Sequence, residues 1–96
     1  MTYKLKLLPK AKTDLKDSRN WYNKQQLELG KKFLFSVHLT FDLLLNNPLL
    51  FAVRYQTMRA APVRDFPFLI YYFIDNEKKY IVITTVLHTS RNPNIV

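Results

Sequence analysis

The amino-acid sequence predicts an α+β fold, in which an antiparallel twisted sheet carries a helical hairpin on one face. One observation is the order of periodic segments. An alternating stretch opens the chain, two stretches with a period of three or four follow, and β-branched and aromatic runs close it, which gives β-α-α-β-β-β. The other is size and composition: 96 residues, 48% apolar and 15% aromatic, suffice for one two-layered domain spanning residues 1–96.

The chain begins with a predicted strand and a predicted helix. Apolar side chains of residues 2–8 alternate with Lys4 and Lys6, which is typical of a half-buried strand. Pro9 ends this strand and suits the first turn of a helix. Residues 11–26 then place their apolar side chains at steps of three or four, as a helix with one buried face does. That face comprises Ala11, Leu15, Ser18 and Tyr22, and Trp21 widens it.

The strongest helical pattern lies in residues 31–46. It follows Gly30, the only glycine of the chain, which separates it from the first helix. Pro48 follows its end. Two helices with so short a connection are expected to form an antiparallel hairpin. The buried face of the second helix is predicted to consist of Phe33, Val37, Phe41 and Leu44.

The second half of the chain is predicted to form three strands. Residues 57–64 read as a strand that Pro62 interrupts, which favours a place near an edge or a bulge. Residues 68–74 are apolar on both faces, as in a central strand. A turn over residues 75–79 leads to a β-branched strand over residues 80–88.

Charge and composition limit the function classes. Fifteen Lys and Arg against seven Asp and Glu give a net charge of +8, which favours an anionic partner but also suits a solvated basic surface. The chain has no cysteine and only His38 and His88, so neither disulfides nor a metal site is expected. The longest apolar run, residues 66–74, is too short for a membrane span. We therefore expect a cytoplasmic protein without a cofactor.

The predicted hairpin between the last two strands gathers a set of charged side chains. If its turn is centred on residues 76 and 77, facing residues have numbers that sum to about 153. His88 then lies opposite Asp65, and the preceding hairpin brings Arg64 beside Phe68. We therefore expect Arg64, Phe68, His88 and Arg91 to meet at one end of the sheet.

A histidine beside two arginines has several chemical interpretations. As a general base with fixed positive charge beside it, His88 could cleave RNA through the 2′-hydroxyl group. The same arrangement would suit a site that binds phosphate or carboxylate, and a histidine at the end of a strand is also a common surface residue. Arg59 lies roughly 16 Å from Arg64 at about 3.3 Å per residue, and is not expected to share this site.

Five segments in order resemble one known family, the RelE/ParE superfamily of toxins from type II toxin-antitoxin systems. The resemblance covers residues 5–93, nearly the whole chain, and no single segment is specific by itself. Its strength comes from the set, in this order, on a β-α-α-β-β-β plan. The segments are DLKDSRNWYNKQ, LGKKF, NNPLLFAVRY, VRDFPFLIYYFID and VLHTSRNP.

The resemblance implies a small bacterial toxin, of a kind associated with plasmid stabilization, which a cognate antitoxin protein holds inactive. In the superfamily the antitoxin usually joins a DNA-binding part to a C-terminal segment that wraps the toxin. Such a segment suits the basic surface, and the residues expected to bind a partner are Trp21, Tyr22 and Arg59. Packing in the core is the alternative role for Trp21 and Tyr22.

The superfamily contains two kinds of toxin. ParE-like members lack nuclease residues and inhibit DNA gyrase by protein contact, whereas RelE-like members are metal-independent ribonucleases that cut mRNA on the ribosome. RelE-like sequences usually have an arginine where this chain has Phe68, and lysines ahead of that strand that are missing here. The ParE-like function is therefore preferred. The RelE-like alternative would use Arg64, His88 and Arg91 as catalytic residues, and a non-toxic basic binding domain is a third possibility.

Overall fold

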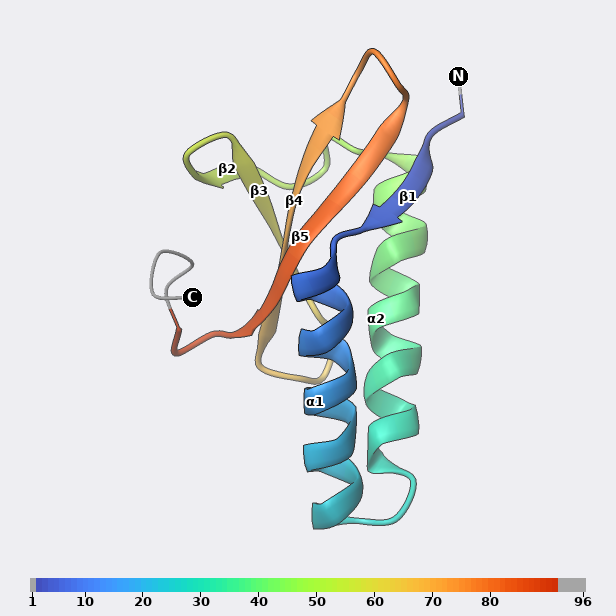
Figure 1. Ribbon diagram of the computed structural model, residues 1–96, viewed down its shortest axis with the longest axis vertical. Coiled ribbons are helices and arrows are strands. Elements are labelled where there is room, and N and C mark those ends of the chain that lie inside the picture. The colour runs from blue at the N-terminus through green and yellow to red at the C-terminus, as the bar shows by residue number, and fades with distance from the viewer. Residues whose placement is uncertain (1, 92–96) are drawn as a thin grey trace.

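The computed structural model describes residues 2–91 as two helices on one face of a five-stranded sheet (Figure 1). The strands lie in the order β1-β5-β4-β3-β2, so β5 and β4 have a strand on both sides. Neither of the described helices is long and apolar enough to cross a membrane. In chain order the elements are β1 (Lys4–Leu7), α1 (Pro9–Gln25), α2 (Leu29–Asn46), β2 (Val53–Tyr55), β3 (Met58–Pro62), β4 (Phe68–Asp75) and β5 (Tyr80–His88).

The sheet is mixed, whereas the sequence predicted an antiparallel one. Strands β2 to β5 pair antiparallel, but β1 runs parallel to β5, with Leu5 opposite Ile81. All the other elements lie between β1 and β5 in the chain, so no tight turn fixes their relative direction. An alternating pattern shows which face of a strand is buried and carries no information about its direction. The prediction was wrong on this point.

The sequence also missed β2 and misjudged the limits of β3. β2 has three residues and is joined to β3 through Gln56 and Thr57, of which Gln56 adopts a left-handed conformation with φ of 52°. No glycine or asparagine marks this turn, so the usual hairpin signal is missing. β3 has a strand on both sides, but only Met58 and Arg59 of β3 pair with β2. Pro62, the last residue of β3, therefore has no β2 residue opposite it, which is a position that a proline tolerates.

The core lies between the helical hairpin and the sheet. On α2, the four side chains predicted to be buried are at most 4% exposed. They pack on Ile70 and Tyr72 of β4 and on Ile81 and Ile83 of β5, all of which are fully buried. A smaller apolar cluster on the other sheet face contains Leu69, Tyr71 and Leu87. Both faces of β4 are therefore buried, as predicted.

Gly30 lies in the first turn of α2, because this helix begins two residues earlier than predicted. Its N–H donates a hydrogen bond to Oδ1 of Asn23 on α1 over 2.9 Å. A Cβ atom at this position would lie only 2.4 Å from the backbone oxygen of Arg19. The two helices therefore approach so closely here that only glycine fits without a shift of the backbone.

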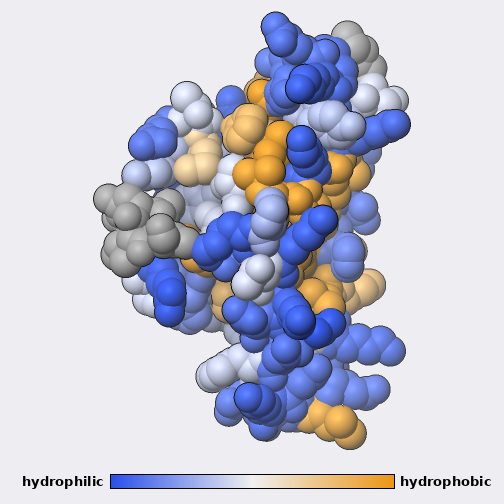
Figure 2. Space-filling view, viewed as in Figure 1, coloured by the Kyte–Doolittle hydropathy of each residue, from blue (hydrophilic) through white to orange (hydrophobic). Residues whose placement is uncertain are grey.

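Basic residues lie on the outside of this core. No lysine or arginine is buried among residues 2–91, and the buried polar side chains there are Ser36, Thr40 and Thr85. Figure 2 shows hydrophilic side chains over most of one face, with apolar ones gathered in a strip across its upper half. The net charge of +8 is thus presented to solvent and to partners.

Tyr72 ties the core to the segment that follows α2. Its ring is fully buried, and its hydroxyl donates a 2.9 Å hydrogen bond to the backbone oxygen of Pro48. Burial raises the pKa of this phenol above 10.0, although the nearby Arg59 guanidinium and a backbone hydrogen bond at Phe51 lower it. The folded protein therefore favours the neutral phenol.

We predict that Tyr72→Phe lowers the free energy of unfolding by about 1 kcal/mol at pH 7, because Pro48 loses its donor. The raised pKa means that the folded state holds the phenolic proton more tightly than the unfolded state does. Its stabilising effect is complete below pH 10 and is lost as pH rises through the folded pKa. Urea unfolding at pH 7 and above pH 10 should show the gap between wild type and variant shrinking. A gap that widens at high pH would contradict this account.

Candidate functional site

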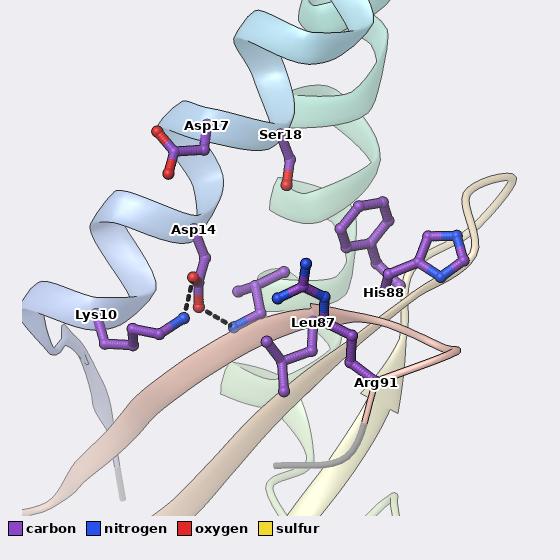
Figure 3. A pocket seen from close by; sticks show the side chains of 9 residues that line it. Lys10, Asp14, Asp17, Ser18, Leu87, His88 and Arg91 are labelled. Atoms are coloured by element: carbon purple, nitrogen blue, oxygen red, sulfur yellow. Dashed lines mark hydrogen bonds and ion pairs between the residues drawn. The ribbon is translucent and has the colours of Figure 1, made fainter. Parts of the chain in front are cut away.

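A groove lies between α1 and the end of β5 (Figure 3). It consists of two adjoining pockets of about 250 and 510 Å³, which share Asp17, Ser18, Phe68 and His88. We call it the α1–β5 groove. Its other lining residues are Lys10, Asp14, Trp21, Tyr22, Pro67, Val86, Leu87 and Arg91.

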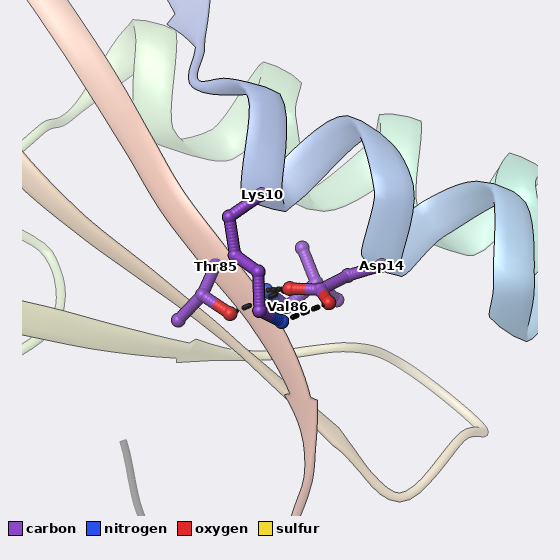
Figure 4. Close-up of polar contacts among 4 residues, drawn as sticks. All are labelled: Lys10, Asp14, Thr85 and Val86. Carbon is purple, nitrogen blue, oxygen red and sulfur yellow. Dashed lines mark hydrogen bonds and ion pairs between the residues drawn. The ribbon is translucent and has the colours of Figure 1, made fainter. Parts of the chain in front are cut away.

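One carboxylate holds the two walls of this groove together. β1 ends at Leu7, and the N–H of Leu8 still donates to the backbone oxygen of Ile83, but no β1 residue pairs with β5 beyond that point. There Asp14 of α1 accepts hydrogen bonds from the Thr85 hydroxyl at 2.5 Å and from the Val86 N–H at 2.9 Å (Figure 4). The side chain of an α1 residue thus replaces the missing strand.

Lys10 completes this contact from one turn earlier on α1. Its ammonium group pairs with the second oxygen of Asp14, at the i and i+4 spacing that a helix brings together. It is the only ion pair that the structure shows within residues 2–91. The Asp14 side chain is only 11% exposed, so three partners satisfy a nearly buried charge.

His88 lies across the pocket from Asp14, at the end of β5 (Figure 3). The backbone N–H of Ser90 donates to its Nδ1 at 3.1 Å, and the Ser90 hydroxyl lies 2.9 Å from the same atom. A ring nitrogen that accepts from an N–H carries no proton, so the neutral imidazole has its proton on Nε2. Its ring also stacks edge-on against Phe68, with centroids 5.4 Å apart. The neutral imidazole of His88 therefore offers only its Nε2–H, as a donor.

The other end of the groove is aromatic. Trp21 is 57% exposed and meets Tyr22 edge to face, with ring centroids 5.1 Å apart. Tyr22 in turn packs against Phe33, Phe66 and the Phe68 ring at centroid distances of 5.0–6.1 Å. Burial among these rings raises the pKa of the Tyr22 phenol. The sequence interpretation of Trp21 as part of the buried stripe was wrong, whereas Tyr22 packs against the core.

The predicted position of His88 needs a correction. It pairs with Phe68, three residues from the predicted partner Asp65. The connection is longer than the sequence indicated, since Asp75 pairs with Tyr80 and four residues lie between them.

A bulge adds the rest of the shift. Tyr71 faces Thr85 and Tyr72 faces Ile83, so Thr84 is an extra residue in β5. Lys79, just before β5, has a left-handed backbone with φ of 61° and no glycine to announce it. The pattern of apolar residues in the sequence reveals neither the bulge at Thr84 nor the left-handed backbone of Lys79.

The arginines of the sequence prediction do not gather at one site. Arg91 reaches back toward α1 and lines the groove together with His88 (Figure 3). Arg64 follows β3 and lines a different pocket, between α2 and Pro62. The expected meeting of Arg64 with His88 and Arg91 is therefore not found. Arg59 is also separate, since its guanidinium donates to the backbone oxygen of Phe51 at 2.6 Å.

Sequence reasoning missed the acidic wall of the groove. Asp14 and Asp17 lie on the polar face of α1, where charged residues are normally just solvated. The sequence shows that Lys10 and Asp14 are spaced i and i+4, which predicts an ion pair on the helix. It does not indicate that Asp14 contacts β5. Only the end of β1 at Leu7 leaves an unpaired edge for Asp14 to bind.

The polar groups that line the groove carry both signs of charge, and several are already engaged. Its cations, Lys10 and Arg91, face two carboxylates, so an RNA phosphate there would meet both signs of charge. Nδ1 of His88 is already engaged, which leaves no free ring nitrogen for a general base in the neutral state. No group of three or more potential metal ligands occurs in the described part of the chain. An apolar side chain flanked by charges fits best.

One family model and two solved toxin-antitoxin structures are similar to this chain. The family model described as "ParE toxin of type II toxin-antitoxin system, parDE" matches residues 5–93. Among solved structures, the chromosomal ParDE system from P. aeruginosa is similar with a TM-score of 0.77 and 20% identity, covering 91% of this chain and 96% of that one. The RelBE2 toxin-antitoxin complex from Mycobacterium tuberculosis is similar with a TM-score of 0.61 and 22% identity, covering 92% and 99%.

No curated protein matches the chain significantly in sequence. The region that the family model matches ends at residue 93 and includes the whole motif VLHTSRNP. The last two residues of this motif, Asn92 and Pro93, lie outside the residues that the structure describes. The two likenesses to solved structures support the β-α-α-β-β-β-β fold.

We predict that Asp14→Ala lowers the free energy of unfolding by about 2–4 kcal/mol, because the Val86 N–H and the Thr85 hydroxyl lose their acceptor in a nearly buried place. Urea unfolding measures this loss. Asp17→Ala is the matched control: it removes an exposed carboxylate one turn further along α1 and should change stability by less than about 0.5 kcal/mol. Equal effects of the two substitutions would refute the role assigned to Asp14.

Proposed function

The chain belongs to the family of ParE toxins of type II toxin-antitoxin systems, and on that premise we propose that it inhibits DNA gyrase by protein–protein contact until a cognate antitoxin neutralises it. Gyrase acts on DNA in the cytoplasm, so the proposal places the toxin there. It requires no cofactor and no bond-making step. The toxin needs only a surface that binds its target tightly enough to block it.

The observation that carries this proposal is the α1–β5 groove, which offers an aromatic anchor beside a charged rim without a nuclease set. At the apolar end of the groove, about half of the Trp21 side chain is exposed. Tryptophan is among the residues that most often dominate the binding energy of interfaces. Arg91 and Asp17 at the polar end can fix the orientation of a partner segment. The engaged Nδ1 of His88 and the position of Arg64 in a different pocket argue against RNA cleavage.

The antitoxin is proposed to act by occupying this groove. A toxin with a net charge of +8 attracts an acidic, unfolded segment, which can fold as it binds. Such a segment would cover Trp21 and Tyr22 and exclude the target by competition. Arg59 donates one hydrogen bond from its guanidinium to the backbone oxygen of Phe51. That Arg59 also contacts a partner stays a prediction.

The direct test is supercoiling by purified gyrase with the purified chain added. We expect inhibition, and we expect Trp21→Ala to raise the concentration for half inhibition by about 30-fold, the effect of losing an anchor worth roughly 2 kcal/mol. Lys12→Ala, an exposed residue of α1 that does not line the groove, is the control and should inhibit like wild type. Melting curves should be unchanged for both variants. Undiminished supercoiling with the wild-type chain would refute the proposal.

One alternative has an observation of its own, because His88 and Arg91 do share a pocket. A RelE-like nuclease would cut translated mRNA on the ribosome, and His88→Ala or Arg64→Ala would abolish cleavage. We expect intact messages by primer extension on induced cells. Cleavage that depends on His88 would replace the gyrase proposal, whereas normal growth of cells that express the chain alone would indicate a non-toxic binding domain.

A further inference from the structure

The solvent-facing side of α2 carries large apolar side chains where a helix normally shows polar ones. Exposed positions recur along this helix at steps of three and four, as one face should. Three of them are Phe35, Leu39 and Leu43, which are 64%, 38% and 50% exposed. They lie one turn apart and form a continuous stripe, which we call the α2 stripe.

Charges beside the α2 stripe are balanced, although the chain as a whole is strongly basic. Lys31 and Lys32 lie toward the start of α2, with Glu28 just before it, and Asp42 lies toward its end. Among residues 2–91 none of these four makes an ion pair. This is therefore a neutral strip on a protein of net charge +8. An acidic or a nucleic-acid partner would be attracted to the rest of the surface rather than here.

We propose that the α2 stripe binds the same stripe of a second copy of this chain, with the two α2 helices antiparallel about a twofold axis. A twofold interface must be complementary to itself, because each residue meets its counterpart twice. A neutral strip with opposite charges at its two ends meets this condition in the antiparallel arrangement. It is also the part of α2 where two basic chains can meet with least repulsion.

One register pairs the central apolar positions of this face and one set of opposite charges, with Leu43 beside the partner's Lys31. If the axis passes at the level of residue 37, Phe35 packs on the partner's Leu39, and Leu39 on the partner's Phe35. The layers on either side then place Lys32 beside the partner's Asp42. These are alternating layers at the three-and-four spacing of an antiparallel helix pair. Two apolar layers are thus flanked by two pairs of opposite charges.

The apolar area also fits a dimer. Three more exposed leucines flank the two ends of α2, with Leu27 just before the helix and Leu49 and Leu50 just after it. With the α2 stripe these six side chains, 38% to 87% exposed, present on the order of 500 Å² of apolar surface. A stable interface buries about 800 Å² on each partner, of which about 65% is apolar between identical subunits.

Sedimentation equilibrium of the purified chain tests the proposal. We expect a concentration-dependent dimer of twice the 11.5 kDa chain mass. Lys32→Asp and Asp42→Lys should each raise the dimer dissociation constant at least about tenfold, because each places like charges in both flanking layers. The double variant restores opposite charges and should return within about threefold of wild type.

Matched measurements separate this interface from general charge effects and from misfolding. Lys16→Asp makes the same charge change on an exposed position of α1 and should leave association unchanged. Circular dichroism should show that all variants are folded, because the substituted positions are exposed. A chain that stays monomeric, or a dimer indifferent to the single reversals or not restored by the double one, overturns the proposal. Gyrase inhibition depends on α1 and is tested separately, so either proposal can fail alone.

Discussion

Where β1 ends at Leu7, the outer edge of β5 loses its partner strand, and the carboxylate of Asp14 takes that strand's place. An unpaired N–H in a buried position costs about as much as a lost hydrogen bond, so this edge needs an acceptor. Because the acceptor comes from α1, the contact also fixes how far the helix lies from β5. The α1–β5 groove is the space that remains between them.

The groove follows from this contact on both of its sides. Toward the C-terminus, β5 continues past Val86 to His88, whose ring packs on Phe68 and whose Nδ1 is held by Ser90. Along α1, the turn after Asp14 places Asp17 and Ser18 on one wall, and the next turn exposes Trp21. A surface built in this way carries both signs of charge and has an apolar anchor. These are the properties of a binding surface for protein segments.

The sequence was sufficient for the features that depend on periodicity. The apolar face of α2, the two-sided burial of β4 and the limits of β5 were predicted because packing imposes a repeat on the residues. Features set by single backbone irregularities were not. The longer connection before β5 and the bulge at Thr84 together moved His88 away from its predicted partner, and the turn at Gln56 hid β2. Asp14 escaped notice because its partners depend on where another strand ends.

Hydrogen exchange at the Val86 amide tests the central claim most directly. Although no strand covers this edge of β5, the account predicts slow exchange in the wild-type protein, comparable with that of amides inside the paired part of the sheet, because the Asp14 carboxylate holds the N–H. NMR measurement of individual amides gives the result. Exchange at Val86 as fast as at the exposed residues that follow β5 would contradict the account.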